Sequence, residues 1–320
     1  MLCFTNTTNE YTMKRAVTII PVISLVFFIF QGCNLPELTP ENNPPEKDSA
    51  GFTFIYMADI HLQPEKMAVE GFNKVIDTVN ALQPAFVITG GDLIMDALGQ
   101  SHARSDSLYK LYNLHIKKIN APVFNTLGNH EVFGLYANSG VDTTHPEYYK
   151  KMYENRIGRR YFSFDTLGWH FIILDAVGST PARRYYGYID KEQQQWLKED
   201  LAKTDTTTPI AISVHIPFIT TFLQLKNGVL TPNDSGLVIV NATEILSLFK
   251  HHNLKLVLQG HVHYLEDIYI NGIHFITGGA VCAGWWSGPV NNIKEGFLKI
   301  NVMNDDFTWE YVEYGWEAVE

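Results

Sequence analysis

Short apolar runs of strand length alternate with helical segments in the first part of this chain. Three such runs, FTFIYMA, AFVITG and APVFNTLG, cover residues 52–58, 85–90 and 121–128. Between the first two, apolar residues recur at the spacing of one helix face: Val69, Phe72, Val75, Ile76 and Val79. A second helix is expected near residues 103–119. This order of strand, helix, strand, helix and strand predicts an α/β layer.

The pattern changes after this layer. The segments expected there are a hairpin over 161–175 that turns at Leu167-Gly168, a helix at 191–203, strands at 209–215 and 254–261, and antiparallel segments to residue 312. A further helix is expected from Asn241, because Asn241 and Glu244 have the spacing of a capping box. We therefore predict an α/β fold, a four-layer α/β/β/α sandwich of two mixed sheets flanked by helices.

Residues 1–33 have the layout of a secretory signal peptide. A basic start at Lys14-Arg15 precedes an apolar run over residues 16–30, which is shorter than a membrane span. The residues before Met13 add nothing that such a signal needs, so Met13 is the expected start. A buried apolar helix is the alternative interpretation of this segment.

Cys33 follows a small residue, Gly32, and this resembles a bacterial lipoprotein signal, in which the cysteine is lipidated and becomes the mature N-terminus. Phe30 and Gln31 depart from the small residues that usually precede that cysteine. Residues 34–50 are rich in proline and are expected to be an extended linker. Residues 51–320 would then form one domain, exported and lipid-anchored in the bacterial envelope, at the periplasmic face or the cell surface.

The overall composition limits the possible partners. Hydrophobic residues make up 46% of the 320 residues, enough for a large core. The formal net charge of −10 argues against a nucleic-acid polymer as partner, because such binding relies on a basic footprint. Three scattered cysteines exclude a disulfide framework and a cysteine zinc site. The oligomeric state is left open.

Side chains that can bind metals stand where the predicted strands end. In chain order they are Asp59, His61, Asp92, Asn129, His130, His215, His261 and His263. The carboxyl ends of strands are where an α/β sheet places its ligand crevice. Oxygen and imidazole ligands without thiolate suit Mn, Fe or Zn at a reactive site rather than a structural zinc. A single such histidine is more often an ordinary surface or core residue, but the joint occurrence in order favours a metal site.

These motifs, ADIH, GGD, GNHE, SVHIP and QGHVH, resemble the pattern of the calcineurin-like metallophosphoesterase superfamily, which runs D-x-H, G-D, G-N-H-[ED], H and G-H-x-H. The resemblance covers nearly all of residues 52–312 and implies a β-sandwich flanked by helices. It also implies two metal sites: Asp59, His61, Asp92 and His263 at the first, and Asp92, Asn129, His215 and His261 at the second. By the same resemblance, His130 is the catalytic residue that protonates the leaving group or steadies the phosphoryl oxygens.

The implied activity is hydrolysis of a phosphate ester, either a diester or a monoester, by a hydroxide that bridges two divalent or trivalent transition-metal ions. Met95 stands where purple acid phosphatases have tyrosine, so a tyrosinate–iron site is not expected. Asp96 lies one position further on than the aspartate that orients the catalytic histidine in serine/threonine phosphatases. Residues 185–201 and 278–289 are similar to the bacterial group near cyclic-nucleotide phosphodiesterases.

Candidate substrate contacts are less defined. Arg183 and Arg184 could reach a phosphate, or could be solvated loop residues. Trp285 and Trp286 could form an aromatic wall beside the site, or could be packing residues. Residues 216–240 form a long segment without periodicity, as functional lids often do. Cys282 is interpreted as a core residue.

Three functions remain open at this point. The leading one is a lipid-anchored phosphoesterase of the cell envelope that acts on a small-molecule phosphate ester. The second is a phosphoesterase that acts on a lipid or cell-wall phosphate. The third is a non-catalytic metal-binding scaffold on the same fold, which the complete set of ligands and the presence of His130 disfavour.

Overall fold

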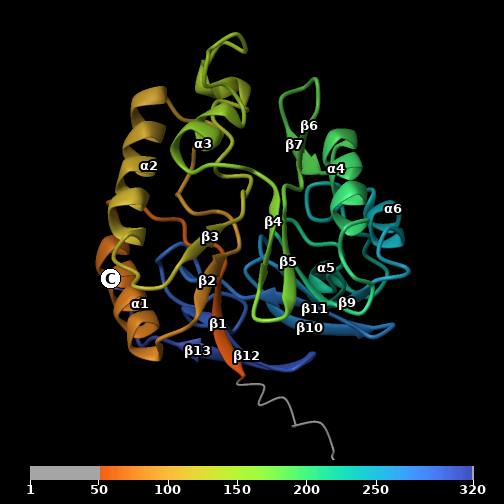
Figure 1. Cartoon of the computed structure of the whole chain (residues 1–320). Coiled ribbons are helices and arrows are strands. Elements are labelled where there is room, and N and C mark those ends of the chain that lie inside the picture. Colours follow the sequence, from red (N-terminus) through yellow and green to blue (C-terminus); the bar gives the residue numbers. More distant parts are fainter. Residues whose placement is uncertain (1–50, 319–320) are drawn as a thin grey trace, which may run out of the picture. The chain divides into compact units, whose positions relative to one another are not determined.

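Two mixed sheets lie face to face in the computed structural model, which describes residues 51–318 (Figure 1). The predicted signal peptide, Cys33 and the proline-rich linker lie outside these residues. The first sheet has the strand order β13-β12-β1-β2-β3. Its strands are β1 (Phe52–Met57), β2 (Phe86–Thr89), β3 (Val123–Asn125), β12 (Gly296–Met303) and β13 (Asp306–Glu313). Strands β1, β2 and β3 are parallel, and β12 and β13 extend the sheet by antiparallel pairing.

The second sheet has the strand order β10-β11-β9-β8-β5-β4. Its strands are β4 (Phe162–Thr166), β5 (Trp169–Leu174), β8 (Pro209–Val214), β9 (Asn253–Gln259), β10 (Leu265–Ile270) and β11 (Ile273–Gly278). Strands β4 and β5 form the predicted hairpin. The expectation that everything after residue 261 is antiparallel was wrong for β11, which pairs parallel to β9 while β10 returns antiparallel beside it. A small ladder of β6 (Val177–Ser179) and β7 (Tyr185–Gly187) stands apart.

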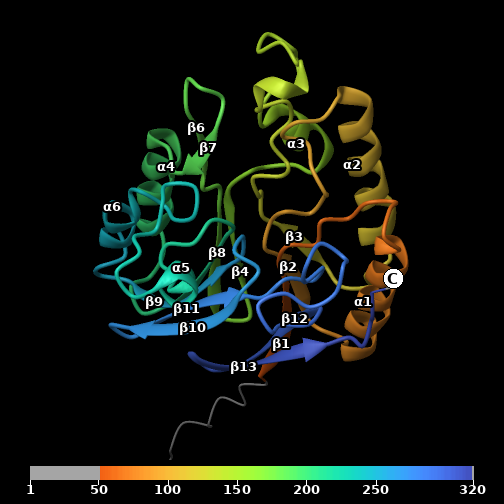
Figure 2. The same ribbon diagram turned by 180° about the vertical axis from the view of Figure 1, so that it is seen from behind.

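The described residues form six α-helices. They are α1 (Ala68–Leu82), α2 (His102–Ile116), α3 (Lys151–Arg156), α4 (Lys191–Leu201), α5 (Phe222–Asn227) and α6 (Ala242–Ser247). Helices α1 and α2 lie outside the first sheet, and α4 and α6 lie outside the second (Figures 1 and 2). The four-layer arrangement predicted from the sequence is therefore confirmed. None of the helices in the described part of the chain is long and apolar enough to cross a membrane.

The inner strands β2, β5 and β8 are almost entirely apolar, because both faces of the sheet are buried there, whereas the outer strands β10 and β13 carry charged and exposed residues. In β1, Phe54 and Tyr56 point into the core between the sheets, whereas Ile55 and Met57 face the core under the helices. The ring of Phe54 meets the ring of Phe171 from β5 edge-on, with centroids 5.5 Å apart. Each fully buried side chain of this size contributes about 1.5–3 kcal/mol. This packing holds the ends of the two sets of strands in register.

Local capping residues explain the starts of two helices, α2 and α4. The Ser101 side chain accepts a hydrogen bond from the Arg104 N–H at the start of α2, and Asp190 accepts one from Gln193 N–H at the start of α4. The capping box expected for α6 was wrong, because the Asn241 side chain makes no cap hydrogen bond. Its amide instead pairs with the backbone N–H and C=O of Ile189. A tertiary contact has replaced the local one.

Candidate metal centre

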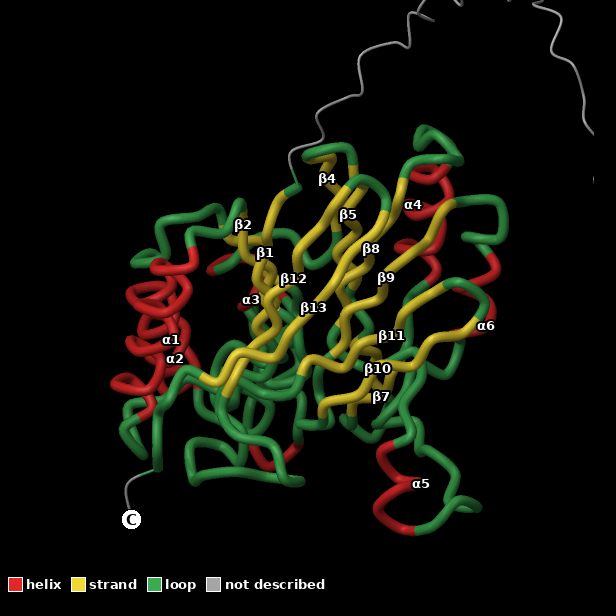
Figure 3. Tube along the Cα trace, turned by 90° about the horizontal axis from the view of Figure 1, so that it is seen from below, coloured by secondary structure: helices red, strands yellow, loops and turns green. Residues whose placement is uncertain are grey.

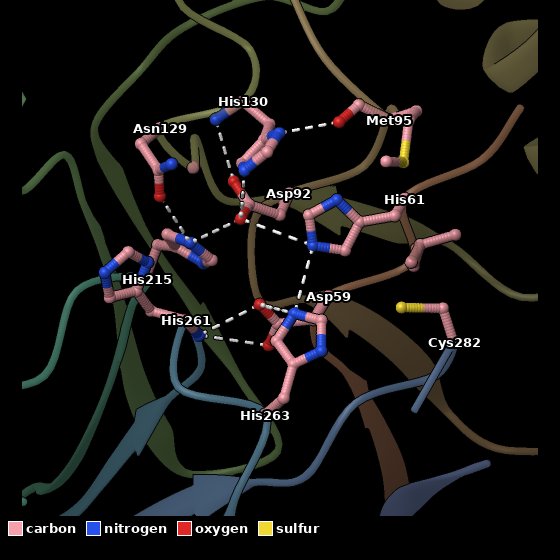
Figure 4. Close-up of polar contacts among 12 residues, drawn as sticks. Asp59, His61, Asp92, Met95, Asn129, His130, His215, His261, His263 and Cys282 are labelled. Carbon is pink, nitrogen blue, oxygen red and sulfur yellow. Dashed lines mark hydrogen bonds and ion pairs between the residues drawn. The ribbon is translucent and has the colours of Figure 1, made fainter. Parts of the chain in front are cut away.

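The side chains predicted to bind metal come together at one edge of the two sheets (Figure 4). Four of them follow strands of the first sheet: Asp59 and His61 come after β1, Asp92 after β2 and Asn129 after β3. The other three follow strands of the second sheet: His215 comes after β8, and His261 and His263 come after β9. The two sheets thus share one site, and all seven side chains are buried or nearly so.

Backbone geometry aims these side chains at one another. Five of the seven residues have a left-handed backbone: Asp59, His61, Asp92, His261 and His263, with φ of 54°, 46°, 51°, 76° and 47°. Such a conformation costs a residue with a side chain roughly 1–2 kcal/mol. Residues held this way concentrate at functional sites, where the surrounding structure over-determines them. A methyl group on Gly128 would overlap the backbone nitrogen and carboxylate of Asp92, so only glycine fits there.

Asp92 lies between two groups of ligand atoms. On one side its Oδ2 is 3.1 Å from His215 Nε2, which is itself 3.1 Å from Asn129 Oδ1. On the other side the same oxygen is 3.5 Å from His61 Nε2. His263 Nε2 completes this second group, 3.1 Å from His61 Nε2 and 3.4 Å from Asp59 Oδ1. A carboxylate in this position can bridge two ions.

Hydrogen bonds behind the rings fix which nitrogen faces the site. His215 Nδ1 donates to the Gly90 carbonyl at 2.8 Å, and His263 Nδ1 donates to the Ala283 carbonyl at 2.6 Å. Their Nε2 atoms therefore carry the lone pairs that face inward. His261 is turned the other way: its Nε2 donates to the Gly236 carbonyl, and its buried Nδ1 has no hydrogen-bond partner. An unpartnered buried nitrogen beside Asp92 and His215 is what a metal ligand requires.

The ionisation of the cluster follows from burial and charge. Burial alone would raise the pKa of Asp92, but the neighbouring His215 and His130 rings hold it well below its usual range. Burial lowers the pKa of His261 to about 4 and that of His61 well below its usual value, so both rings are neutral near pH 7. The Asp92 carboxylate outweighs burial at His215 and raises its pKa to about 9. Asp92 therefore presents a negative charge that favours a cation beside it.

These features fit the donor set of a pair of transition-metal ions. Carboxylate, amide oxygen and neutral imidazole ligands suit Mn, Fe or Zn. Cys282 Sγ lies near His61 and His263 but is buried, and burial raises the pKa of its thiol well above the usual value. Its sulfur contacts the Ala283 carbonyl at 3.7 Å, behind the His263 ring. The thiol is therefore placed as a core residue, as expected.

His130 is held over the cluster, and one of its ring nitrogens lies within 4.8 Å of ligand atoms of His61 and Asp92. Its backbone N–H donates to Asp92 Oδ1 at 2.9 Å, and its ring Nδ1 donates to the Met95 carbonyl at 2.6 Å. The ring stands edge-on to that of His61, with centroids 4.6 Å apart, and its Nε2 is 3.9 Å from Asp92 Oδ2. Asp96 Oδ1 lies 3.6 Å from Nδ1, although this aspartate is displaced by one position in the sequence. The Nε2 edge is the part of the ring available to a substrate.

Glu131 is a residue that sequence reasoning did not single out. Its buried carboxylate accepts hydrogen bonds from the backbone N–H groups of Asp92, Leu93, Ile94 and Gly128, at 2.7 to 3.1 Å. Burial, together with the Asp92 charge, raises its pKa to about 8, against these four donors, which favour the ionised form. The carboxylate ties the loop after β2 to the loop after β3. The only sequence signal was its place at the end of GNHE.

A cleft of about 320 Å³ opens over the cluster. Besides His130 and ligand residues, its walls include side chains that the sequence did not indicate: Tyr185, Phe222, Lys226, Leu237, Val262, Val290 and Asn291. Phe222 and Lys226 belong to α5, within the segment 216–240 that was expected to act as a lid. Larger cavities elsewhere in the described residues lack the ligand set.

The four proposed substrate contacts separate into two pairs. Trp285 lines the cleft, with its ring 4.6 Å from that of His263, while Trp286 is buried and donates from Nε1 to the carbonyls of Ile60 and His61. Arg183 turns away and donates to backbone carbonyls of residues 134–141, so its guanidinium braces that loop. Arg184 remains exposed, over the Tyr136 ring at 5.0 Å. For Trp286 and Arg183 the structure thus gives packing and bracing roles instead.

Comparisons with known proteins agree with this geometry. No curated protein matches the sequence. A solved dimetal phosphatase from Danio rerio aligns over 81% of this chain and 95% of its own, with a TM-score of 0.57 and 16% identity. The anchor protein GAP50 of the Plasmodium inner membrane complex aligns over 83% of this chain and 85% of its own, with a TM-score of 0.54 and 15% identity. At such identities these likenesses concern the fold.

The family model for calcineurin-like phosphoesterases matches residues 52–265, which span β1 to the start of β10 and contain all seven proposed metal ligands together with His130. The chain therefore belongs to the calcineurin-like phosphoesterase family and is a metal-dependent hydrolase of phosphate esters.

Proposed function

We propose that this protein hydrolyses phosphate monoesters or diesters at the bacterial cell envelope with a pair of Mn, Fe or Zn ions. The observation that carries the proposal is the position of Asp92, whose Oδ2 lies within 3.5 Å of imidazole nitrogens in both ligand groups. Asp59, His61 and His263 would hold one ion, and Asn129, His215 and His261 the other. When bound, two such ions polarise a phosphoryl group and lower the pKa of water.

The chain's own residues supply position and protons. The neutral Asn129 oxygen adds a ligand without adding negative charge, which favours the approach of an anionic substrate. His130 is the proton donor in the proposal: because its Nδ1–H is committed to the Met95 carbonyl, a proton that reaches a leaving oxygen comes from Nε2. Lys226 and Trp285 line the cleft and are placed to contact parts of the substrate away from the phosphate ester bond.

Location at the envelope rests on the sequence before residue 51. Lys14-Arg15, the apolar run and Gly32-Cys33 support export and lipidation at Cys33. In the proposal, the proline-rich linker carries the catalytic domain beyond the lipid anchor.

Asp92→Asn tests the proposed site directly. The variant keeps the size of the side chain but removes the charge that would bridge the ions, so we expect it to lose most of both metals and nearly all activity. Metal content is measured by mass spectrometry, and activity with bis-p-nitrophenyl phosphate and p-nitrophenyl phosphate on metal-reconstituted protein. Asp165→Asn, on the exposed β4–β5 hairpin, is the control. Full metal content in Asp92→Asn would show that the site is assigned wrongly.

A further inference from the structure

The segment around α5 carries an unusually apolar tip. We define the α5 lobe as residues 220–233, which stand out from the body of the molecule (Figure 3). At its tip Leu225, Val229 and Leu230 are 67%, 82% and 94% exposed. Single exposed apolar residues are common on soluble proteins, but three within six positions of one projecting lobe form a patch, and such patches mark interaction sites.

Hydrogen bonds hold the lobe in this projecting position. Gln224 Nε2 donates to the Thr231 carbonyl at 2.6 Å, and Asn233 Nδ2 donates to the Thr220 carbonyl at 3.0 Å, so the two ends of the lobe are joined. The Thr221 N–H and hydroxyl both donate to the Glu266 carboxylate on β10, at 3.0 and 2.8 Å. These hydrogen bonds fix the ends of the lobe, so that Leu225, Val229 and Leu230 are held in solvent.

The apolar tip adjoins the cleft over the proposed metal centre. Phe222 and Lys226, on the cleft side of α5, line that cleft, with the Lys226 ammonium 5.2 Å from the centre of the Phe222 ring. Another wall of the same cleft is formed by Trp285, which is 41% exposed. A surface that contacts the apolar tip would therefore lie at the mouth of the cleft.

The charges of the lobe differ from those of the protein as a whole. Between residues 216 and 233 the only charged side chain is Lys226, whereas the whole chain has a formal net charge of −10. Apolar side chains with a neighbouring lysine suit a lipid–water interface, where hydrocarbon accepts the former and headgroup phosphates the latter. A convex, uncharged tip fits insertion between lipids better than it fits the enclosure of a single tail.

We infer that the α5 lobe docks on a lipid surface and brings the cleft to phosphate esters held in that surface. Leu225, Val229 and Leu230 enter the boundary of the hydrocarbon, and Lys226 lies among the headgroup phosphates. The docking itself is independent of catalysis; the conclusion that the substrate is an amphiphilic phosphate ester rests on the proposed function.

Vesicle binding tests the docking. Asp48–Glu320 forms one compact unit that contains both hydrophobic cores, so a protein of residues 48–320 reports on the lobe without the apolar N-terminal run. We expect it to float with vesicles of phosphatidylcholine and one-quarter phosphatidylglycerol. The affinity of the triple variant Leu225→Ser, Val229→Ser, Leu230→Ser for the vesicles should fall by about ten-fold or more, because each lost side chain removes apolar area from the interface.

A matched control carries the same number of changes at exposed apolar residues outside the lobe: Leu114→Ser, Leu167→Ser and Met303→Ser. This variant should float like the unmodified protein. Equal binding of the lobe variant and the unmodified protein, or no flotation of either, would overturn the inference. So would a dimer in analytical ultracentrifugation that the lobe variant converts to a monomer, because the tip would then bind a second copy.

Hydrolysis of soluble p-nitrophenyl esters by the full chain separates the two proposals. The lobe variant should keep this activity, which also shows that its fold is intact. Vesicle binding without hydrolysis of any soluble or lipid phosphate ester would reject the proposed function and leave the docking in place. Hydrolysis of soluble esters without vesicle binding would reject the docking and leave the proposed function in place.

Discussion

Asn129 and His130 are neighbours in the chain, yet their side chains have different surroundings. The Asn129 oxygen points to His215 Nε2 within the ligand set, whereas the His130 ring is turned to the Met95 carbonyl and stands over His61. Asn129 is placed to bind a metal ion, and His130 is placed to contact a substrate bound over the metal site. The two roles can therefore be separated by substitution.

His130→Ala should keep both metals and lose turnover. General acid–base help contributes about 10²–10⁴-fold, and kcat should fall by roughly this factor. The loss should be larger for alkyl phosphate esters than for p-nitrophenyl esters, because p-nitrophenolate leaves without a proton. Steady-state kinetics on both ester types, with metal analysis of the same samples, measures this.

Asn129→Ala is the matched comparison for that variant. It should weaken the second metal and recover activity when Mn²⁺ is added. An equal loss on alkyl and p-nitrophenyl esters in His130→Ala, or loss of metal from it, would mean that His130 is a ligand or a structural residue.

At the scale of the elements, the loops after β2 and β3 depend on one buried carboxylate. Glu131→Gln keeps the shape but turns an amide NH₂ toward backbone N–H donors that now face the Glu131 oxygens. An unsatisfied buried donor costs about 1–3 kcal/mol, so the free energy of unfolding should fall by roughly that amount and metal retention should weaken. Urea unfolding and metal analysis measure the two effects. Glu65→Gln, which breaks an exposed pair with Arg104, should change stability by less than about 1 kcal/mol.

The β4–β5 hairpin carries a pH-dependent contact with α4. His170 lies between Asp165 Oδ1 at 2.7 Å and Asp200 Oδ2 at 2.9 Å. Burial opposes the charged ring, but the two carboxylates outweigh it and raise the pKa of His170; the nearby His252 adds only a weak repulsion. Because the folded-state pKa is raised, this stabilisation is complete below the ordinary histidine pKa of about 6.5 and is lost as pH rises through the folded-state value.

His170→Gln should therefore lower the free energy of unfolding by about 1–2 kcal/mol at pH 5.5, and by clearly less at pH 9. Asp165 is largely exposed, which limits the effect. The difference between variant and unmodified protein in urea unfolding at the two pH values measures it, and the exposed His251→Gln serves as control. A loss that is equal at both pH values would show that the contact is not ionic.

Periodicity in the sequence predicted most elements but not their partners. The spacing of Phe72, Val75 and Val79 gave α1, and Leu167-Gly168 gave the β4–β5 turn. It could not show that β11 pairs parallel to β9, because a strand has the same pattern in either direction. The capping-box spacing likewise assigned the Asn241 amide to the wrong partner. The spacing does not show that this amide bonds to the backbone of the distant Ile189 instead of the start of α6.

At the scale of the whole molecule, the metal ligands were more predictable than the substrate contacts. Each proposed ligand follows a strand, and parallel strands bring their carboxyl ends to one edge. Arg183 and Trp286 have no such constraint: their partners are carbonyls of loops far away in the sequence. Residue type alone does not distinguish a guanidinium that binds phosphate from one that braces a loop. The lining of the cleft by Lys226 likewise depends on the fold of the α5 lobe.

The proposed lipidation at Cys33 is tested on the full chain. The unmodified protein, expressed in a Gram-negative host, should incorporate labelled palmitate and fractionate with membranes, and Cys33→Ala should not be labelled, because the thiol proposed to accept the lipid is gone. Cys282→Ala, which removes a buried thiol, should label normally. Palmitate that persists on Cys33→Ala would exclude the lipoprotein interpretation.

The proposed metal ligands come from both sheets, and this arrangement has a consequence for the protein in the cell. Ions that bind only the folded chain would stabilise it by RT ln(1 + [L]/Kd), and at the proposed site they would also join the two layers of the sandwich. When metal is scarce, the sheets would separate more often and expose the aromatic core between them to proteases. We therefore expect the abundance of this protein to follow the supply of transition metal around it, with no regulator needed to read that supply.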